Sequence, residues 1–310
     1  MLEMILPLLG LTLAGTAVMS NDAVQTLGTF MASNKKTPWW KLWGAASAVL
    51  ISTVLYSWFA YNGDISFGRL DKIPHVTVQW YHALAPGVLL LLTRYGIPVS
   101  TTFLVLSAFA STVVFEKMLA KSMLGYAISA TVAYAFWMVL AKHLDEKKKV
   151  KQEHERAWRM AQWGTTGFLW FTWLSHDLAN IAVFAPRQIS PELLVGILIL
   201  LVSVLAHVFY SQGGKIQQIV NEKSTTSYVR SATIIDAVYA FILLYLKQMN
   251  NIPMSTTWVF VGLLCGRELA IATRKDKKIK KVFPLVAKDF MKMMVGLSIS
   301  VVLVLLVQEL

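Results

Sequence analysis

Two pairs of short polar motifs contain the residues with the greatest capacity for chemistry. Residues 20–25 (SNDAVQ) are similar to residues 175–180 (SHDLAN), and residues 97–103 (IPVSTTF) are similar to residues 252–258 (IPMSTTW). In both pairs the second copy follows the first by 155 residues, which is half of the 310-residue chain. Two motifs that recur in the same order at one offset predict an internal duplication.

The first motif pair offers ligands for a cation. Asp22 and Asp177 lie at or inside apolar stretches, and an aspartate at the centre of a membrane helix costs about 2.5–3.5 kcal/mol. Such residues usually face a cavity or an ion path; the alternative is a pair of helix caps at the membrane surface. With the neighbouring amides, the carboxylates form a set of hard oxygens suited to Na⁺, or sites for H⁺. The predicted cation-binding residues are Asn21, Asp22, His176, Asp177 and Asn180, with Na⁺ held by Asn21, Asp22, Asp177 and Asn180.

Each Pro-x-Ser-Thr-Thr segment predicts a helix that begins within the depth of the membrane. Proline removes an amide donor and disfavours helix in the residue before it, and Ser or Thr caps the helix that follows. A helix N-terminus with free N–H groups and hydroxyls is suited to an anion. The alternative for these Ser and Thr residues is hydrogen bonding between helices. The predicted substrate-binding residues are Asp22, Gln25, Ser100, Thr101, Thr102, Asp177, Asn180, Ser255, Thr256 and Thr257.

The composition indicates that these motifs are positioned by membrane helices. Hydrophobic residues make up 56% of the chain, charged residues only 15%, and the mean hydropathy is +0.55. Soluble domains are about 45–50% apolar and about 25% charged, so a soluble enzyme, a disordered chain and a disulfide scaffold are excluded. The lone Cys265 permits no intrachain disulfide. The net charge of +12 is expected to reflect cytoplasmic loops in a lipid bilayer, not nucleic-acid binding.

The apolar runs predict ten membrane segments, because about 20 apolar residues span the hydrocarbon as a helix. One stretch, 77–115, has an alternative interpretation as a re-entrant hairpin with its tip near Pro98. Asp236 lies within the eighth segment, where the first repeat has Tyr81, and whether it lines a cavity is left open. The predicted segments are 3–20, 42–60, 77–93, 99–115, 122–141, 158–175, 191–210, 229–247, 254–272 and 286–308.

Basic residues predict the orientation of these segments. Only six of the 29 Lys and Arg residues fall on one face of the predicted topology, and the rest lie in loops on the other face. The positive-inside rule then places the rich face in the cytoplasm and both termini outside. We expect a first repeat at 1–141, a basic cytoplasmic linker at 142–157 and a second repeat at 158–310. Because each repeat has an odd number of crossings under either interpretation of 77–115, the halves enter the membrane from opposite sides. The predicted fold is thus an all-α polytopic membrane protein with two inverted-topology repeats of about five segments each and broken or re-entrant helices.

The motifs resemble those of the inorganic phosphate transporter (PiT) family. Its members carry a Gly-Ala-Asn-Asp-Val-x-Asn-type signature and a Pro-Val-Ser-Thr-Thr-His-type segment in each half. Here the four stretches 20–29, 97–103, 175–180 and 252–258 follow in the family's order. The resemblance implies an inverted repeat with helical hairpins, and symport of phosphate driven by Na⁺ or H⁺, with some relatives carrying sulfate. It also suggests a homodimer. By the same resemblance, ion and substrate sites would use Asn21, Asp22, Gln25, Asp177 and Asn180, and the anion donors would be Ser100, Thr101, Thr102, Ser255, Thr256 and Thr257.

The chain departs from the family pattern at four positions. His176 and Gln25 each stand where Asn is expected, and Phe103 and Trp258 stand where the family usually has His. His176 either carries a proton near neutral pH or replaces the hydrogen bonding of Asn.

We therefore expect a secondary active transporter that moves inorganic phosphate with Na⁺ or H⁺ across the plasma (inner) membrane and needs no other cofactor. The cations would offset the repulsion between the anion and the aspartates. The alternatives are a sulfate permease of the same family and a passive anion channel. Phosphate is favoured because hydrogen phosphate, unlike sulfate, has a proton to give to Asp22 or Asp177. The sequence has no His-Glu-x-x-His, Gly-x-Ser-x-Gly or P-loop motif, so neither an intramembrane enzyme nor an ATP-driven pump is expected.

Overall fold

The computed structural model describes residues 2–94, 99–140, 152–214, 217, 228–274 and 279–308. All regular structure in these ranges is helical. The elements are α1 (Leu2–Ala17), the π-helical turn η1 (Val18–Asp22), α2 (Ala23–Ser33), α3 (Trp39–Ala60), α4 (Trp80–Arg94), the π-helical turn η2 (Thr102–Leu106), α5 (Thr112–Leu140), α6 (Gln152–Asp177), α7 (Ala179–Ala182), α8 (Pro191–Tyr210), α10 (Val229–Met249), α11 (Thr256–Arg274) and α12 (Ile279–Gln308).

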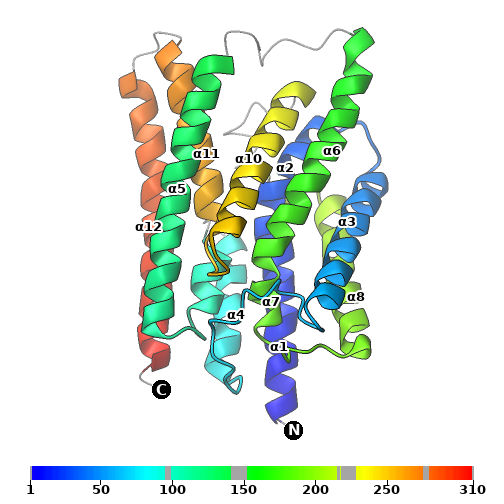
Figure 1. Cartoon of the computed structure of the whole chain (residues 1–310), viewed down its shortest axis with the longest axis vertical. Coiled ribbons are helices and arrows are strands. Elements are labelled where there is room, and N and C mark those ends of the chain that lie inside the picture. The colour runs from blue at the N-terminus through cyan, green and yellow to red at the C-terminus, as the bar shows by residue number, and fades with distance from the viewer. Residues whose placement is uncertain are drawn as a thin grey trace.

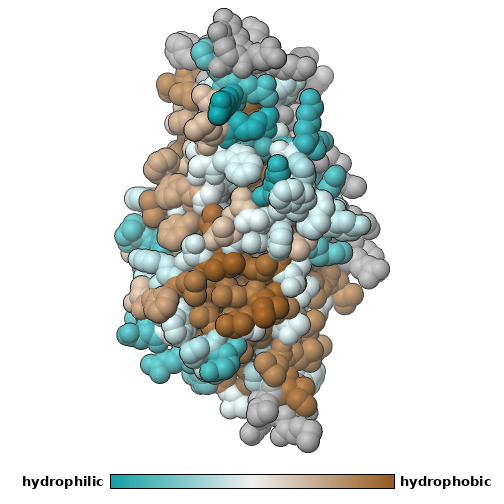
Figure 2. Space-filling view, turned by 90° about the vertical axis from the view of Figure 1, so that its right-hand side faces the viewer, coloured by the Kyte–Doolittle hydropathy of each residue, from teal (hydrophilic) through white to brown (hydrophobic). Residues whose placement is uncertain are grey.

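Several helices are long and apolar enough to cross a bilayer, which agrees with the predicted multi-pass membrane protein. Five stretches among the described residues meet this condition: Ile5–Ser33, Trp39–Ala60, Thr112–Leu140, Pro191–Tyr210 and Val229–Met249. On the side of the molecule where α3 and α8 lie in Figure 1, hydrophobic residues form a band across the lower half (Figure 2). The exposed Val195 and Ile199 of α8 are suited to contact lipid rather than water.

Figure 1 shows the direction of each helix along the long axis of the molecule. The α1–α2 rod rises from the lower to the upper end, α5 also rises through the full length, and α12 descends. In contrast, α4 occupies only the lower half, while α10 descends from the upper end to the middle and α11 returns upward. The chain thus contains two hairpin-like regions that approach the middle from opposite ends. The relation of the two halves by an inverted repeat stays a prediction.

The predicted crossing at 99–115 is wrong. Its helical part before α5 is only the five-residue turn η2, which is followed by turns at 107–110. With 15 residues, α4 is about 22 Å long, too short for about 30 Å of hydrocarbon. The re-entrant alternative therefore describes this region. The chain leaves the helical conformation at 107–110, five residues after Thr102, so no helix of membrane length forms between Val99 and α5. Pro98 lies outside the described residues.

The structure also moves two predicted boundaries. The first segment does not end at residue 20 but continues through η1 and α2 to Ser33, as one stretch from Ile5. The polar Ser-Asn-Asp sequence lies in the π-helical turn η1, and the chain stays helical from α1 through η1 into α2. Of the predicted linker 142–157, the part up to 151 lies outside the described residues, and 152–157 form the start of α6. Charged residues at 152–157 are compatible with a helix that extends beyond the apolar segment.

Helices α5 and α11 pack closely because two glycines of α11 allow it. A Cβ atom at Gly266 would collide with the backbone carbonyl of Ala130, and one at Gly262 would collide with Tyr126 and Ser129. Small residues four apart are a recurring device for close helix contact in membranes. This contact fixes α11, and with it the second Pro-x-Ser-Thr-Thr segment, against a full-length helix.

A candidate ion and anion site at the broken helices

The first aspartate motif lies in η1, where the π-helical turn interrupts the α1–α2 rod. Asp22 is 1% exposed and Asn21 is fully buried. The Asn21 Nδ2 atom donates to Asp22 Oδ1 over 2.7 Å and to the backbone oxygen of Val99 over 3.3 Å. Gln25 Nε2 donates to the same Asp22 oxygen over 3.4 Å. The motif is therefore tied to the first Ser-Thr-Thr segment, which begins one residue after Val99.

The second aspartate motif lies where α6 ends and the chain continues into α7. Asn180 Nδ2 donates to Asp177 Oδ1 over 3.0 Å and lies 3.5 Å from Thr102 Oγ1. The Thr256 hydroxyl lies beside the Asp177 carboxylate without completing a hydrogen bond of normal geometry. At the corresponding position of the first half, the Thr101 hydroxyl lies beside Asp22 without completing a hydrogen bond of normal geometry. Each aspartate thus lies beside the first threonine of the Ser-Thr-Thr segment in its own half of the chain.

The two Ser-Thr-Thr segments have matching hydrogen bonds. Ser100 Oγ accepts from the Phe103 N–H over 3.3 Å, and Ser255 Oγ accepts from the Trp258 N–H over 3.2 Å. These bonds are the side-chain caps that the sequence predicts. The segments also touch each other, since Thr102 Oγ1 donates to the backbone oxygen of Met254 over 3.2 Å.

Phe103 and Trp258, which stand where the PiT-type motifs usually have His, pack against each other. The ring centroids of Phe103 and Trp258 are 5.2 Å apart, and both side chains are nearly inaccessible to solvent. Where the family usually has His, this chain therefore has a hydrophobic contact between its two polar segments.

The structure brings all the predicted site residues into one buried region. None is more than 7% exposed, and hydrogen bonds link the motifs of the two halves through Thr102. The site is accordingly enclosed by protein. Its members are Asn21, Asp22, Gln25, Ser100, Thr101, Thr102, His176, Asp177, Asn180, Ser255, Thr256 and Thr257.

His176 belongs to this region, but its ring is directed to other partners. Its Nε2 atom lies 2.9 Å from the backbone oxygen of Leu243 and 3.5 Å from an Arg69 Nη2 atom. This contact with Leu243 requires a proton on Nε2. The geometry favours the hydrogen-bonding role over direct cation binding by this nitrogen.

Arg69 is a buried residue of this region that sequence reasoning missed. It is 1% exposed, and it donates from Nε to the backbone oxygen of Ser175 over 2.7 Å. Burial lowers the pKa of the Arg69 guanidinium to about 10, against the opposing attraction of Asp177, so the group remains charged at neutral pH. A permanent positive charge thus lies near one carboxylate. The sequence indicated this residue only in one way: Arg69 is one of the six Lys and Arg residues on the predicted extracytoplasmic face.

Lys121 holds the segment that precedes the second Ser-Thr-Thr. Its Nζ atom donates to the backbone oxygen of Asn250 (2.8 Å), to Asn250 Oδ1 (2.8 Å) and to the backbone oxygen of Ile252 (2.9 Å). These three bonds use all the donors of the ammonium group. The non-helical backbone at 250–255 is therefore held from α5.

We expect Lys121→Met to lower the free energy of unfolding by about 3 kcal/mol, because hydrogen bonds to a charged group contribute about 1.5–3 kcal/mol each and the carbonyls would stay buried. Lys117→Met, which changes an exposed lysine one turn away, is the control and should change stability by less than about 0.5 kcal/mol. Thermal unfolding of the purified protein in detergent measures both. Equal stability of the two variants would contradict the anchoring role.

Four oxygen atoms in this region lack a hydrogen-bond partner among the described residues. They are Asn21 Oδ1, Thr101 Oγ1, Asp177 Oδ2 and Asn180 Oδ1. Buried polar atoms almost always have partners, and several exceptions in one place call for an explanation. Oxygen-only sets with a carboxylate are what hard cations bind. The same region holds hydroxyl donors and the N-terminus of the 19-residue helix α11, which are suited to an anion.

The comparisons with known proteins found one similar solved structure. A solved structure entitled "The sodium-dependent phosphate transporter" matches with a TM-score of 0.63 and 18% sequence identity, over 99% of each chain. No family model matches the sequence, and no curated protein matches it. The chain therefore has an all-helical fold with several helices apolar enough to cross a membrane, and it shares that fold with the solved protein.

Proposed function

We propose that this chain is a secondary active transporter that carries inorganic phosphate together with Na⁺ or H⁺. The observation that carries the proposal is the group of four unpartnered, buried oxygens at Asn21, Thr101, Asp177 and Asn180. They lie beside the hydroxyl-rich start of α11. Cation ligands and anion donors in one enclosed region favour the joint binding of both ions. The similarity of fold to a sodium-dependent phosphate transporter supports the same assignment.

The coupling follows from electrostatics. Asp22 and Asp177 are both buried in this region, and two carboxylates would repel an anion placed beside them unless cations bound first. In a low-dielectric interior this repulsion is much stronger than in water. Phosphate would thus bind well only after Na⁺ or H⁺, and uphill flux of the anion would be driven by the cation gradient. Arg69 supplies part of the positive charge permanently.

The anion would be held by the two Ser-Thr-Thr segments. We assign this role to Ser100, Thr101 and Thr102 from the first half and to Ser255, Thr256 and Thr257 from the second. The first-turn N–H groups of α11 add donors and a favourable dipole. Alternating access would come from opposite movements of two inverted repeats of the PiT type, in the plasma membrane with both termini outside.

Uptake by proteoliposomes tests the proposal. The purified chain should concentrate labelled phosphate against its gradient when a Na⁺ or a pH gradient is imposed, and one of the two ions should suffice. Ionophores that dissipate the driving gradient are the control and should stop the accumulation. Sulfate uptake with no phosphate uptake would refute the substrate, and flux that never exceeds equilibrium would indicate a passive anion channel.

We expect Thr256→Val to raise the KM for phosphate about tenfold, because a hydrogen bond to a charged group contributes about 1.5–3 kcal/mol. The variant conserves side-chain shape, so the maximal rate should change less. Thr273→Val, near the other end of α11, is the matched control. Initial rates of labelled phosphate uptake over a range of concentrations give both constants. An unchanged KM for Thr256→Val would exclude this hydroxyl from the substrate site.

A further inference from the structure

A row of buried polar side chains leads away from the candidate site toward the upper end of the molecule. It runs between α2, α6 and α10, which pack against one another. None of these side chains is more than 6% exposed, and they alternate with apolar neighbours along each helix. We call this row the polar seam; it consists of Thr26, Thr29, Gln162, Thr166, Thr233 and Asp236.

The polar seam ends beside a cavity at the upper end. The cavity has a volume of about 710 Å³, and Ser33, Asn34, Arg159 and Tyr228 contribute to its lining. Lys35 and Lys36 also line it, and basic residues at this end agree with the predicted cytoplasmic side. The seam is thus a connection between the enclosed site and the cavity that opens on that side.

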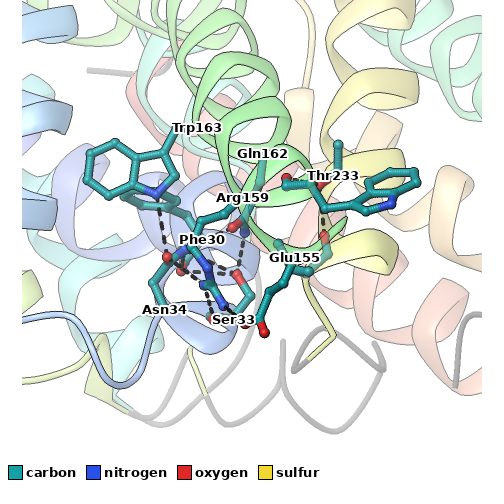
Figure 3. A network of polar contacts seen from close by, with 10 residues as sticks. Phe30, Ser33, Asn34, Glu155, Arg159, Gln162, Trp163 and Thr233 are labelled. Atoms are coloured by element: carbon teal, nitrogen blue, oxygen red, sulfur yellow. Dashed lines mark hydrogen bonds and ion pairs between the residues drawn. The ribbon is translucent and has the colours of Figure 1, made fainter. Parts of the chain in front are cut away.

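A hydrogen-bond network closes the seam where it meets the cavity (Figure 3). Asn34 Nδ2 donates to Gln162 Oε1 over 3.0 Å, and Gln162 Nε2 donates to Ser33 Oγ. Arg159 donates to Asn34 Oδ1 over 2.9 Å and to the backbone oxygen of Ser33 over 3.0 Å. These hydrogen bonds hold the C-terminal end of α2 against the first turns of α6. Separation of the two helices here would open the polar seam to the cavity.

Asp236 occupies the middle of the seam and is fully buried. It accepts hydrogen bonds from Thr29 Oγ1 over 2.6 Å and from Thr166 Oγ1 over 2.5 Å, one on each carboxyl oxygen. No Lys, Arg or His among the described residues forms an ion pair with it. The role proposed above for Asp22 and Asp177 does not use this third buried carboxyl group.

The surroundings of Asp236 contain no charge that would stabilise an anion. The described part of α2 has no titratable residue, and Arg230 is about 9 Å away along α10. Several other titratable groups on α10 and on the helices packed against it have hydrogen bonds elsewhere: Arg159 with Asn34, His176 with Leu243, Asp177 with Asn180, Tyr239 with Thr256, Lys121 with Asn250, and Arg267 with Glu268.

An ionised carboxylate without a counter-charge is very costly in such a place. One carboxyl group and two hydroxyls are fewer oxygen ligands than the roughly six or more that a hard cation such as Mg²⁺ or Ca²⁺ takes. A proton needs no such set of ligands. Protonated Asp236 can donate to one threonine oxygen and accept from the other.

We propose that Asp236 is a proton-binding site on the cytoplasmic pathway, and that it must be protonated for this side of the transporter to close. When the seam opens, water reaches the carboxyl group, which ionises at neutral pH like any solvated aspartate. Closure then requires one proton from the cytoplasmic side. Internal pH would therefore set how readily the transporter returns to the enclosed state. This inference rests on the proposed transport function.

The test compares Asp236→Asn with the wild type in proteoliposomes whose internal pH is varied at constant external pH. Wild-type phosphate uptake should fall as internal pH rises, by up to about tenfold per pH unit where closure limits the rate, because one proton is bound. In Asp236→Asn, whose neutral amide can bond to both threonines, this response should disappear. Asp71→Asn, which changes an exposed carboxylate between α3 and α4, should respond like the wild type.

Two transport results would overturn the proposal. The first is an internal-pH response of Asp236→Asn equal to that of the wild type. The second is a response that depends on Asp236 but follows internal Na⁺ at constant pH, which would assign the site to a metal ion.

Infrared spectroscopy separates this inference from the proposed function, since it does not require transport. At neutral pH the wild type should show the C=O stretch of a neutral carboxyl group that is lost in Asp236→Asn and kept in Asp71→Asn. Identical spectra for all three proteins would overturn the inference, even if phosphate uptake were normal. Presence of the band in a chain that moves no phosphate would support the site and reject the proposed function.

Discussion

Asp177→Asn is expected to abolish uphill phosphate uptake while leaving the protein folded. The asparagine can still accept the hydrogen bond from Asn180, but the negative charge that a coupled cation needs is lost. Removal of one member of a buried charge pair costs about 3–5 kcal/mol, which corresponds to a loss of cation affinity of at least about 100-fold. Initial rates of uptake under a Na⁺ or pH gradient, at rising cation concentration, measure the loss.

The same result is expected for Asp22→Asn, because this carboxylate lies in the equivalent place of the first motif. Glu192→Gln is the control, since it removes an exposed carboxylate at the first turn of α8 and should leave uptake unchanged. The coupling assignment is wrong if both aspartate variants accumulate phosphate against its gradient as the wild type does.

The second large effect is expected from Gly266→Ala, a change of one methyl group. The added Cβ would collide with the Ala130 carbonyl, so α11 would have to move away from α5. Overpacking of this kind costs about 1–3 kcal/mol, occasionally more, and here the obstacle is backbone. We expect a loss of about 3 kcal/mol in the free energy of unfolding, seen as a lower thermal midpoint in detergent.

Gly196→Ala provides the matched control for that change. Gly196 lies in α8, and no atom lies within 4 Å of the place that an added methyl group would take. Alanine should therefore raise stability by about 0.5–1 kcal/mol through its better helix propensity, and the two identical substitutions should have opposite signs. A Gly266→Ala protein as stable as the wild type would show that the α5–α11 contact is not tight.

Much of the candidate site was predictable because its chemistry is local and repeated. The Ser100 and Ser255 caps follow from short-range preferences, and their hydrogen bonds to Phe103 and Trp258 match in the two halves. The approach of Asp22 and Asp177 was predictable only through the common offset of the motifs. No local rule places two residues so far apart in sequence beside each other.

The remaining features depend on long-range packing that hydropathy does not encode. The stretch 99–115 is apolar enough for a crossing, yet its helix ends at 107–110 and the protein surrounds it. In the sequence, Arg69 looks like an ordinary basic residue of a loop. Its hydrogen-bond partners, the backbone oxygens of Ser175 and Ile252, lie in the other half of the chain, so local sequence could not indicate them. The Thr29 and Thr166 contacts of Asp236 likewise join three helices.

The burial of Cys265 has a practical consequence for spectroscopy. This thiol is the only one in the chain, and it is 4% exposed on α11, so water-soluble maleimides should react with it slowly. Reporter dyes could then be attached to single new cysteines at exposed positions such as Lys36 and Gln188 without altering the native thiol. Fluorescence from opposite ends of one molecule would reveal whether the two ends change conformation at the same time or in turn.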